Sequence, residues 1–130
     1  MSKSMKIHHI AIWTASLEEM KQFYCTYFNG ISNQKYINLT KGFESYFIHF
    51  DDGVSLELMR RKDVTHQSES EYLGYCHLAF SIGSKAELIE LTERLRKDSY
   101  QIVGEPRVTG DGYFESVVLD VDGNRVELVA

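Results

Sequence analysis

Cysteine and proline are scarce in this chain of 130 residues, which has two Cys and one Pro. The two thiols, Cys25 and Cys76, do not make a disulfide framework, and with no signal peptide in view a cytoplasmic location is expected. Apolar runs extend over only a few residues, which excludes a membrane-spanning helix. Basic residues are outnumbered, with 14 Lys and Arg against 19 Asp and Glu, so no nucleic-acid partner is expected.

Several catalytic signatures are also absent. The chain has no Gly-rich phosphate loop, no nucleophile elbow and no Cys-x-x-Cys pair. Its composition is that of a folded globular protein, with 43% hydrophobic and 25% charged residues and 9 Gly. Residues 1–130 therefore predict a single domain that is large enough to bury a core without disulfides.

The two halves of the chain repeat a pattern of residues in the same order. Residues 9–12 (HIAI) match residues 77–80 (HLAF), and residues 52–58 (DGVSLEL) match residues 122–128 (DGNRVEL). The histidine and the glutamate of each copy are 48 residues apart in the first half and 50 in the second. Matches in one order at nearly fixed offsets indicate an internal duplication. We expect half-modules at 6–60 and 75–130, joined by a polar linker at 61–74.

Each half is predicted to form a strand, a helix and three further strands. A Ser-x-x-Glu capping box at 16–19 and at 84–87 starts the helix. Apolar residues at helical spacing are Leu17, Met20, Phe23, Tyr24 and Phe28 in the first half, and Ala86, Ile89, Leu91 and Leu95 in the second. The expected strands after the helix are 35–39, 45–50 and 54–60 in the first half, and 99–104, 114–120 and 125–129 in the second.

Strand periodicity places one histidine and one glutamate of each half on the sheet face away from the helix. Side chains alternate faces along a strand, so the apolar neighbours of these residues pack under the helix. If the two sheets oppose one another, His9, Glu57, His77 and Glu127 converge. Two imidazoles and two carboxylates suit a divalent first-row metal and leave positions open for water or substrate. We predict that these four residues are metal ligands.

The other histidines and the cysteines fit structural roles better. His8 has Cys76 as its counterpart in the second half, His49 has no histidine counterpart, and His66 lies in the linker. We interpret these three histidines as structural or solvated. Cys76 is expected to be a small core residue and not a nucleophile.

The stretch from about Lys6 to Ala130 resembles the vicinal oxygen chelate superfamily, and within it the short bacterial glyoxalase I (lactoylglutathione lyase) branch. The motifs that carry the resemblance are 9–12 (HIAI), 56–58 (LEL), 77–80 (HLAF) and 122–128 (DGNRVEL). Glu57 is the discriminating residue, because ring-cleaving dioxygenases and fosfomycin-modifying relatives typically lack a glutamate there. The resemblance implies an α+β fold with two βαβββ modules forming a curved mixed sheet around a metal site. It also implies a homodimer in which two chains build each site.

The implied activity is a lyase reaction, the isomerisation of a hemithioacetal of methylglyoxal to a thioester. A bound metal would act as a Lewis acid on two adjacent oxygens of the small-molecule substrate. The resemblance makes Glu127 the main catalytic base and Glu57 a ligand and candidate second base. Nickel or cobalt is the metal favoured by the short chain, and zinc is the alternative.

Two positions depart from the glutathione-using members. Four residues after the first histidine, where an arginine is typical, this chain has Trp13, and four residues after the first glutamate it has Arg61. Both are candidate substrate-binding residues for a different thiol, although Trp13 fits a place in the core equally well. Two alternatives stay open: another metal-dependent enzyme of this fold, such as an epimerase or dioxygenase, and a non-catalytic protein that binds a small molecule or antibiotic.

Overall fold

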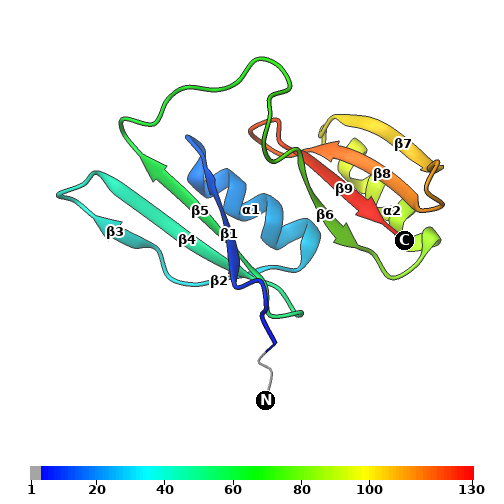
Figure 1. Ribbon diagram of the computed structural model, residues 1–130, viewed down its shortest axis with the longest axis horizontal. Coiled ribbons are helices and arrows are strands. Elements are labelled where there is room, and N and C mark those ends of the chain that lie inside the picture. The colour runs from blue at the N-terminus through cyan, green and yellow to red at the C-terminus, as the bar shows by residue number, and fades with distance from the viewer. Residues whose placement is uncertain (1–3) are drawn as a thin grey trace. The chain divides into compact units, whose positions relative to one another are not determined.

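The computed structural model describes residues 4–130, which divide into two compact units on either side of His66 and Gln67. This division lies inside the segment 61–74 that was expected to link the half-modules. Both units combine one helix with one sheet that contains parallel and antiparallel pairs, so the predicted α+β class is confirmed (Figure 1). No helix among the described residues is long and apolar enough to cross a membrane.

Unit 1 contains β1 (His9–Trp13), α1 (Leu17–Phe28), β2 (Ile31–Ser32), β3 (Tyr36–Asn38), β4 (Phe43–His49) and β5 (Ser55–Arg61). The strand order is β1-β5-β4-β2, with β3 also paired to β4. β1 runs parallel to β5, whereas the pairings of β4 are antiparallel. α1 packs on one face of this sheet, against β4 and β5. The two-residue strand β2 was not expected, because so short a segment has no periodicity.

Unit 2 contains β6 (His77–Ser81), α2 (Lys85–Lys97), β7 (Ile102–Val108), β8 (Phe114–Leu119) and β9 (Arg125–Val129). Its strand order is β6-β9-β8-β7, and β6 runs parallel to β9 as β1 does to β5. α2 packs against β7 and β8. β7 begins three residues later than expected, because Ser99 takes a left-handed backbone (φ 73°) just after α2 and the chain must turn before it extends.

The first helix begins and packs largely as its sequence predicts. Its five expected apolar residues are all buried: Leu17, Met20, Phe23, Tyr24 and Phe28. The capping box is wrong in one detail, since the Ser16 side chain makes no cap hydrogen bond. Instead the Ser16 N–H donates to Oγ1 of Thr14 at 2.9 Å, so a neighbouring hydroxyl takes part in the turn into the helix.

The second helix is capped as predicted, because the Ser84 hydroxyl accepts the Glu87 N–H at 3.1 Å. Of its expected apolar residues Leu95 is buried and Leu91 is half-buried, whereas Ala86 and Ile89 are exposed. The rest of the buried face consists of Leu88 and Thr92, which were not expected. Thr92 was missed because its hydroxyl is polar. In the structure that hydroxyl donates to the Leu88 carbonyl at 2.7 Å and lies 2.8 Å from Oγ of Ser116, which satisfies it inside the core.

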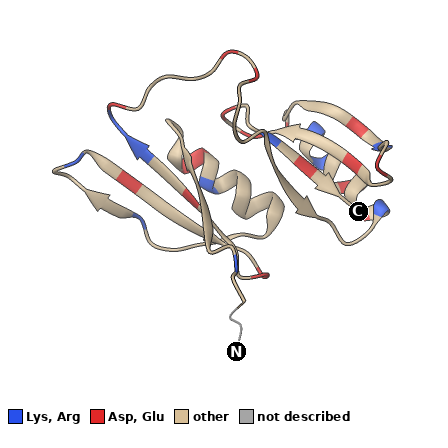
Figure 2. Cartoon of the chain, in the orientation of Figure 1, with Lys and Arg blue, Asp and Glu red and all other residues tan. Residues whose placement is uncertain are grey.

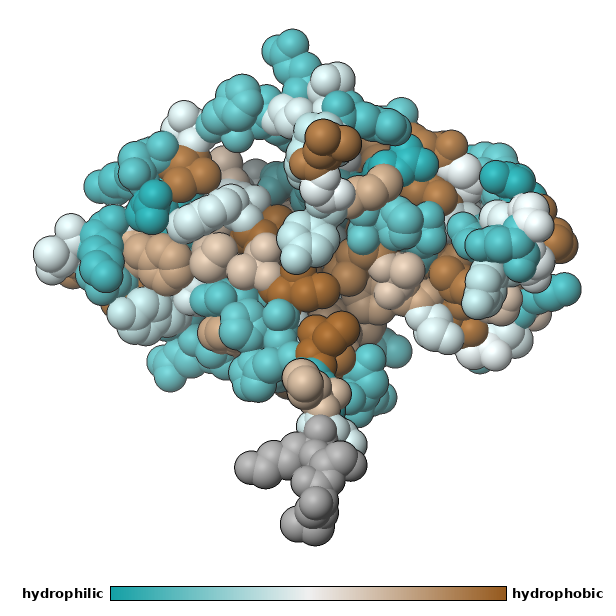
Figure 3. Space-filling view, viewed as in Figure 1, coloured by the Kyte–Doolittle hydropathy of each residue, from teal (hydrophilic) through white to brown (hydrophobic). Residues whose placement is uncertain are grey.

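Charged and hydrophobic side chains are mixed on the surface of the chain. Figure 2 shows acidic residues on strands of both units as well as on loops. Hydrophobic residues interrupt the hydrophilic ones on the face drawn in Figure 3, and the exposed large ones include Leu39, Tyr72 and Leu73.

Candidate metal centre

In unit 1 the pairing of β1 with β5 brings a histidine beside a glutamate. The parallel register places His9 opposite Ser55 and Ala11 opposite Glu57, so the two functional side chains point from one face of neighbouring strands. Nε2 of His9 lies 3.6 Å from Oε1 of Glu57. The histidine side chain is 38% exposed and the glutamate side chain 17% exposed, so the pair is open on the histidine side.

Unit 2 repeats this arrangement with the same register. His77 pairs with Arg125 and Ala79 with Glu127 across β6 and β9. Nε2 of His77 lies 3.3 Å from Oε1 of Glu127, and the two side chains are 38% and 19% exposed. Each unit therefore brings together the two predicted ligands that its own half supplies.

The distances fit a pair of ligands on one divalent ion. Two donor atoms that each lie about 2.0–2.2 Å from a metal, at angles between square and tetrahedral, are about 2.8–3.6 Å apart. The observed separations of 3.3 and 3.6 Å lie within this range. Among residues 4–130 no three His, Cys, Asp or Glu side chains form a metal-binding group. The union of the two pairs in one site is a prediction.

Aromatic rings surround the pair in unit 1. The Phe47 ring lies edge-on to that of His9, with centroids 5.3 Å apart, and Phe47 is the antiparallel neighbour of Glu57. On its other side His9 meets His8, whose Nδ1 is 2.8 Å from Nδ1 of His9. His8 was expected to be structural or solvated, and the sequence did not indicate this contact with His9.

The two candidate substrate-binding residues of unit 1 touch each other. The Arg61 guanidinium lies over the Trp13 ring at 5.0 Å from its centroid, and Phe43 meets the same indole edge-on at 6.2 Å. Trp13 is 41% exposed, so the alternative that it belongs to the core is wrong. Arg61 also donates from Nε to the Asp63 carboxylate, and this bond lowers the pKa of Asp63. Sequence reasoning missed Phe43, although it directly faces Arg61 across β4 and β5.

A second carboxylate shares the ligand face of unit 2. Glu115 on β8 is opposite Val129, and its neighbour two residues on, Val117, is opposite Glu127. Glu115 and Glu127 are thus diagonal neighbours on one face, a separation at which long side chains interact. Burial raises the pKa of Glu115, and the negative charges of Glu127 and Asp111 raise it further. Arg107 and His77 oppose the shift. The sequence alone did not identify Glu115, because only the register between β8 and β9 makes it a neighbour of Glu127.

The remaining expectations have mixed outcomes. His49 hydrogen-bonds through Nδ1 to Oγ of Ser55 at 2.7 Å, which suits a structural role, and His66 is exposed. Cys76 is exposed as well, so its expected place in the core is wrong. The reason is its position in the loop just before β6, outside the strands and helices that form the core.

Comparison with known proteins gives one family. The model of the Glyoxalase/Bleomycin resistance protein/Dioxygenase superfamily matches residues 6–128. The uncharacterized protein YqjT of Bacillus subtilis (strain 168) is 26% identical over 129 residues, which cover 95% of this chain and 98% of that protein.

Solved structures share the fold at low identity. Trypanothione-dependent glyoxalase I of Leishmania major has a TM-score of 0.77 and 23% identity, covering 97% of this chain and 86% of that one. A V278E mutant of glyoxalase I from Zea mays has a TM-score of 0.77 and 20% identity, covering 95% of this chain. The present chain spans 44% of the maize chain.

Proposed function

The chain belongs to the Glyoxalase/Bleomycin resistance protein/Dioxygenase superfamily, and from that premise we propose that it is a metal-dependent lyase of the glyoxalase type. The proposed reaction isomerises the hemithioacetal of methylglyoxal and a thiol to a thioester. The observation that carries the proposal is the repeated pair: in each unit a histidine on the first strand lies within 3.6 Å of a glutamate on the parallel last strand. A binding protein without a metal has no need of this arrangement twice.

The metal would be held by His9, Glu57, His77 and Glu127. Neutral imidazoles and two carboxylates balance the charge of a divalent ion, and we propose nickel or cobalt, with zinc as the alternative. When bound, the ion would supply Lewis-acid polarisation of two neighbouring substrate oxygens. Each unit offers only two ligands, so the complete set needs both units, from one chain or from two chains of a homodimer.

Proton transfer would be the task of the carboxylates. Glu127 would take the proton from the carbon beside the carbonyl and return it to the neighbouring carbon, which leaves atoms and charge balanced for an isomerisation. Glu57 would act as a ligand and second base. The exposed side of each pair is where substrate would approach, since the histidines are twice as exposed as the glutamates beside them.

Substrate beyond the reacting carbons would lie on unit 1. Trp13 and Arg61 occupy the same sheet face as His9 and Glu57, four residues further along their strands. An exposed indole with a guanidinium on its ring presents an apolar wall with polar N–H groups beside it. This surface differs from the arginine expected for glutathione, and it supports a thiol other than glutathione.

The test is a hemithioacetal isomerase assay with nickel, cobalt and zinc, each with several thiols, together with metal analysis of protein purified without chelators. The variant E127Q should lower kcat by at least about 100-fold, the usual contribution of a general base. The control E90Q changes an exposed glutamate on α2 and should leave activity unchanged.

The outcomes separate the alternatives. Wild-type activity in E127Q would overturn the assignment of Glu127. Bound metal with oxygen consumption on a catechol would favour a dioxygenase instead. Absence of bound metal, with no thermal stabilisation by any of the three ions, would favour a non-catalytic binding protein.

A further inference from the structure

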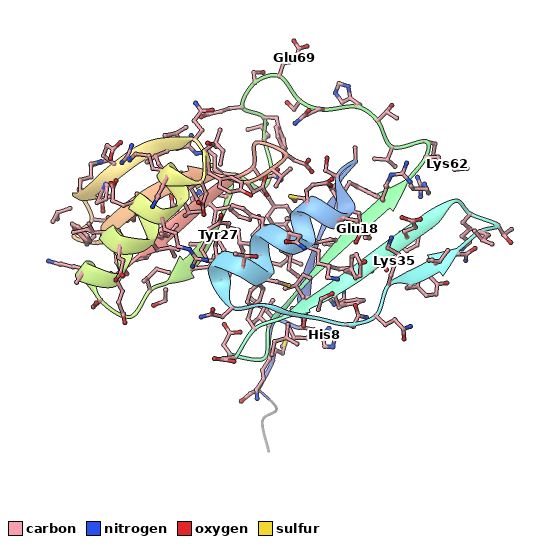
Figure 4. All side chains as sticks on the ribbon, turned by 180° about the vertical axis from the view of Figure 1, so that it is seen from behind. His8, Glu18, Tyr27, Lys35, Lys62 and Glu69 are labelled. Carbon is pink, nitrogen blue, oxygen red and sulfur yellow. The ribbon has the colours of Figure 1, made fainter. Side chains whose placement is uncertain are left out.

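His8, labelled in Figure 4, lies immediately before β1 in unit 1. It contacts His9, the first predicted ligand. Nδ1 of His8 is 2.8 Å from Nδ1 of His9, with the rings edge to face and their centroids 5.0 Å apart. The His8 backbone is fixed as well, because its carbonyl accepts the Ser55 N–H of β5 at 3.0 Å. The two imidazoles are therefore held together by a side-chain bond and by the strand pairing.

The two nitrogens of the His9 ring face different partners. Nδ1 lies at hydrogen-bond distance from His8, whereas Nε2 faces Glu57 at 3.6 Å, which is beyond the range of an N–H···O bond. A neutral imidazole has a proton on one nitrogen and a lone pair on the other. A hydrogen bond between two neutral rings requires one proton between them, on His8 or on His9. A metal ligand must offer its lone pair to the ion.

We propose that His8 is a positioning residue that accepts a hydrogen bond from Nδ1–H of His9 and so keeps the His9 lone pair on Nε2, the nitrogen beside Glu57. In this arrangement His8 has its own proton on Nε2 and its lone pair on Nδ1. The hydrogen bond also fixes the rotation of the His9 ring. This inference rests on the proposed function for its consequence, tighter metal binding, but the protonation of His9 is a property of the metal-free chain.

Unit 2 provides an internal contrast. Counting back one residue from each predicted ligand, the counterpart of His8 is Cys76, whose thiol is a weak hydrogen-bonding group. Of the two predicted histidine ligands, His9 is therefore the one that we expect a neighbouring side chain to orient. Removing His8 should affect His9, and changing Cys76 should affect neither ligand.

The first experiment uses the full chain without metal, labelled with ¹⁵N-histidine, at an alkaline pH where free imidazole is neutral. Long-range ¹H–¹⁵N correlation distinguishes a nitrogen that bears a proton from one that does not. In the wild type we expect His9 to be protonated at Nδ1. The variant H8F keeps a ring at this position but has no nitrogen, and it should shift His9 toward protonation at Nε2. Wild-type His9 protonated at Nε2, or an unchanged tautomer in H8F, would overturn the proposal.

In the second experiment the metal-free chain is titrated with Zn²⁺ alone, and calorimetry measures the binding affinity. Loss of a partner that orients a metal-bound histidine typically weakens the metal about 10-fold or more, and we expect this for H8F. The variant H8Q restores an acceptor oxygen and should bind nearly as tightly as the wild type, as should C76A. Equal affinity for H8F and wild type contradicts the proposed consequence. If the wild type binds no metal, the proposed function fails, while the tautomer measurement still decides the role of His8.

Discussion

The two units share one topology and one His–Glu register, but the sheet faces that carry these pairs have different chemistry. Around His9 and Glu57 the face is aromatic, with Trp13, Phe43 and Phe47. The positions that correspond to Trp13 and Phe47, counted from the ligands, are Ser81 and Val117 in unit 2. Unit 2 instead adds Glu115 beside Glu127. Backbone pairing preserves the ligand pair, whereas the surrounding side chains are free to diverge.

From this difference we infer that the two units have different tasks in the proposed reaction. An aromatic face with a cation suits the binding of a substrate, and a face with a second carboxylate and the proposed base suits proton transfer.

The buried cores of the two units also differ, with aromatic residues in unit 1 where unit 2 has small hydroxyl residues. Tyr24 and Tyr46 fill the core positions of unit 1 that Thr92 and Ser116 fill in unit 2, counted from the matching motifs.

Breaking the buried hydroxyl pair of unit 2 should have the largest effect on stability. Ser116 is 2% exposed, and in T92V its hydroxyl loses its partner in the core. A buried polar group left unpaired costs about 1–3 kcal/mol, which we expect in the free energy of unfolding measured with urea. The double variant T92V/S116A removes both hydroxyls and should recover part of the loss. A single variant as stable as the wild type would show that the pair contributes nothing.

Exchange of the aromatic residue for its counterpart should affect substrate binding less strongly. W13S gives unit 1 the residue that unit 2 has at this position, and it removes both the indole and the stacking surface of Arg61. We expect KM for the preferred hemithioacetal to rise about tenfold, equivalent to about 1.4 kcal/mol, with a smaller change in kcat. The matched control S81A should leave KM unchanged. A loss confined to kcat would place Trp13 in the chemical step instead.

The smallest expected effect is the pH dependence that Glu115 contributes to the metal-free chain. Burial and Glu127 raise the pKa of Glu115, so folding favours its protonated form. Its stabilising contribution is complete below the unfolded pKa of about 4.3 and is lost as pH rises through the higher folded pKa. E115Q should therefore be more stable than the wild type at neutral pH and lose this advantage in acid. The measurement is the free energy of unfolding of both proteins as a function of pH, with E90Q as the control. A difference between wild type and E115Q that does not change with pH would contradict the prediction.

The sequence predicted the helices and strands best where apolar residues recur at regular spacing over a long segment. All five expected residues of α1 are buried, and the turns at Asp52-Gly53 and Asp122-Gly123 join the last two strands of each unit. The pattern was less reliable for α2, whose buried face includes a threonine. It also missed β2 and the late start of β7, because two-residue strands and a left-handed turn residue leave no period to detect.

Two features of this protein followed from its sequence alone: the duplication, and the presence of one histidine and one glutamate on matching strands of each half. Both depend on order and parity along the chain, which are local properties. The tertiary structure decided the distances within each pair, because these depend on which strands become parallel neighbours and in what register. It also decided which side chains far apart in sequence meet them, such as Phe43 with Trp13 and Glu115 with Glu127. No local pattern contains these contacts, since they arise only when the sheet forms.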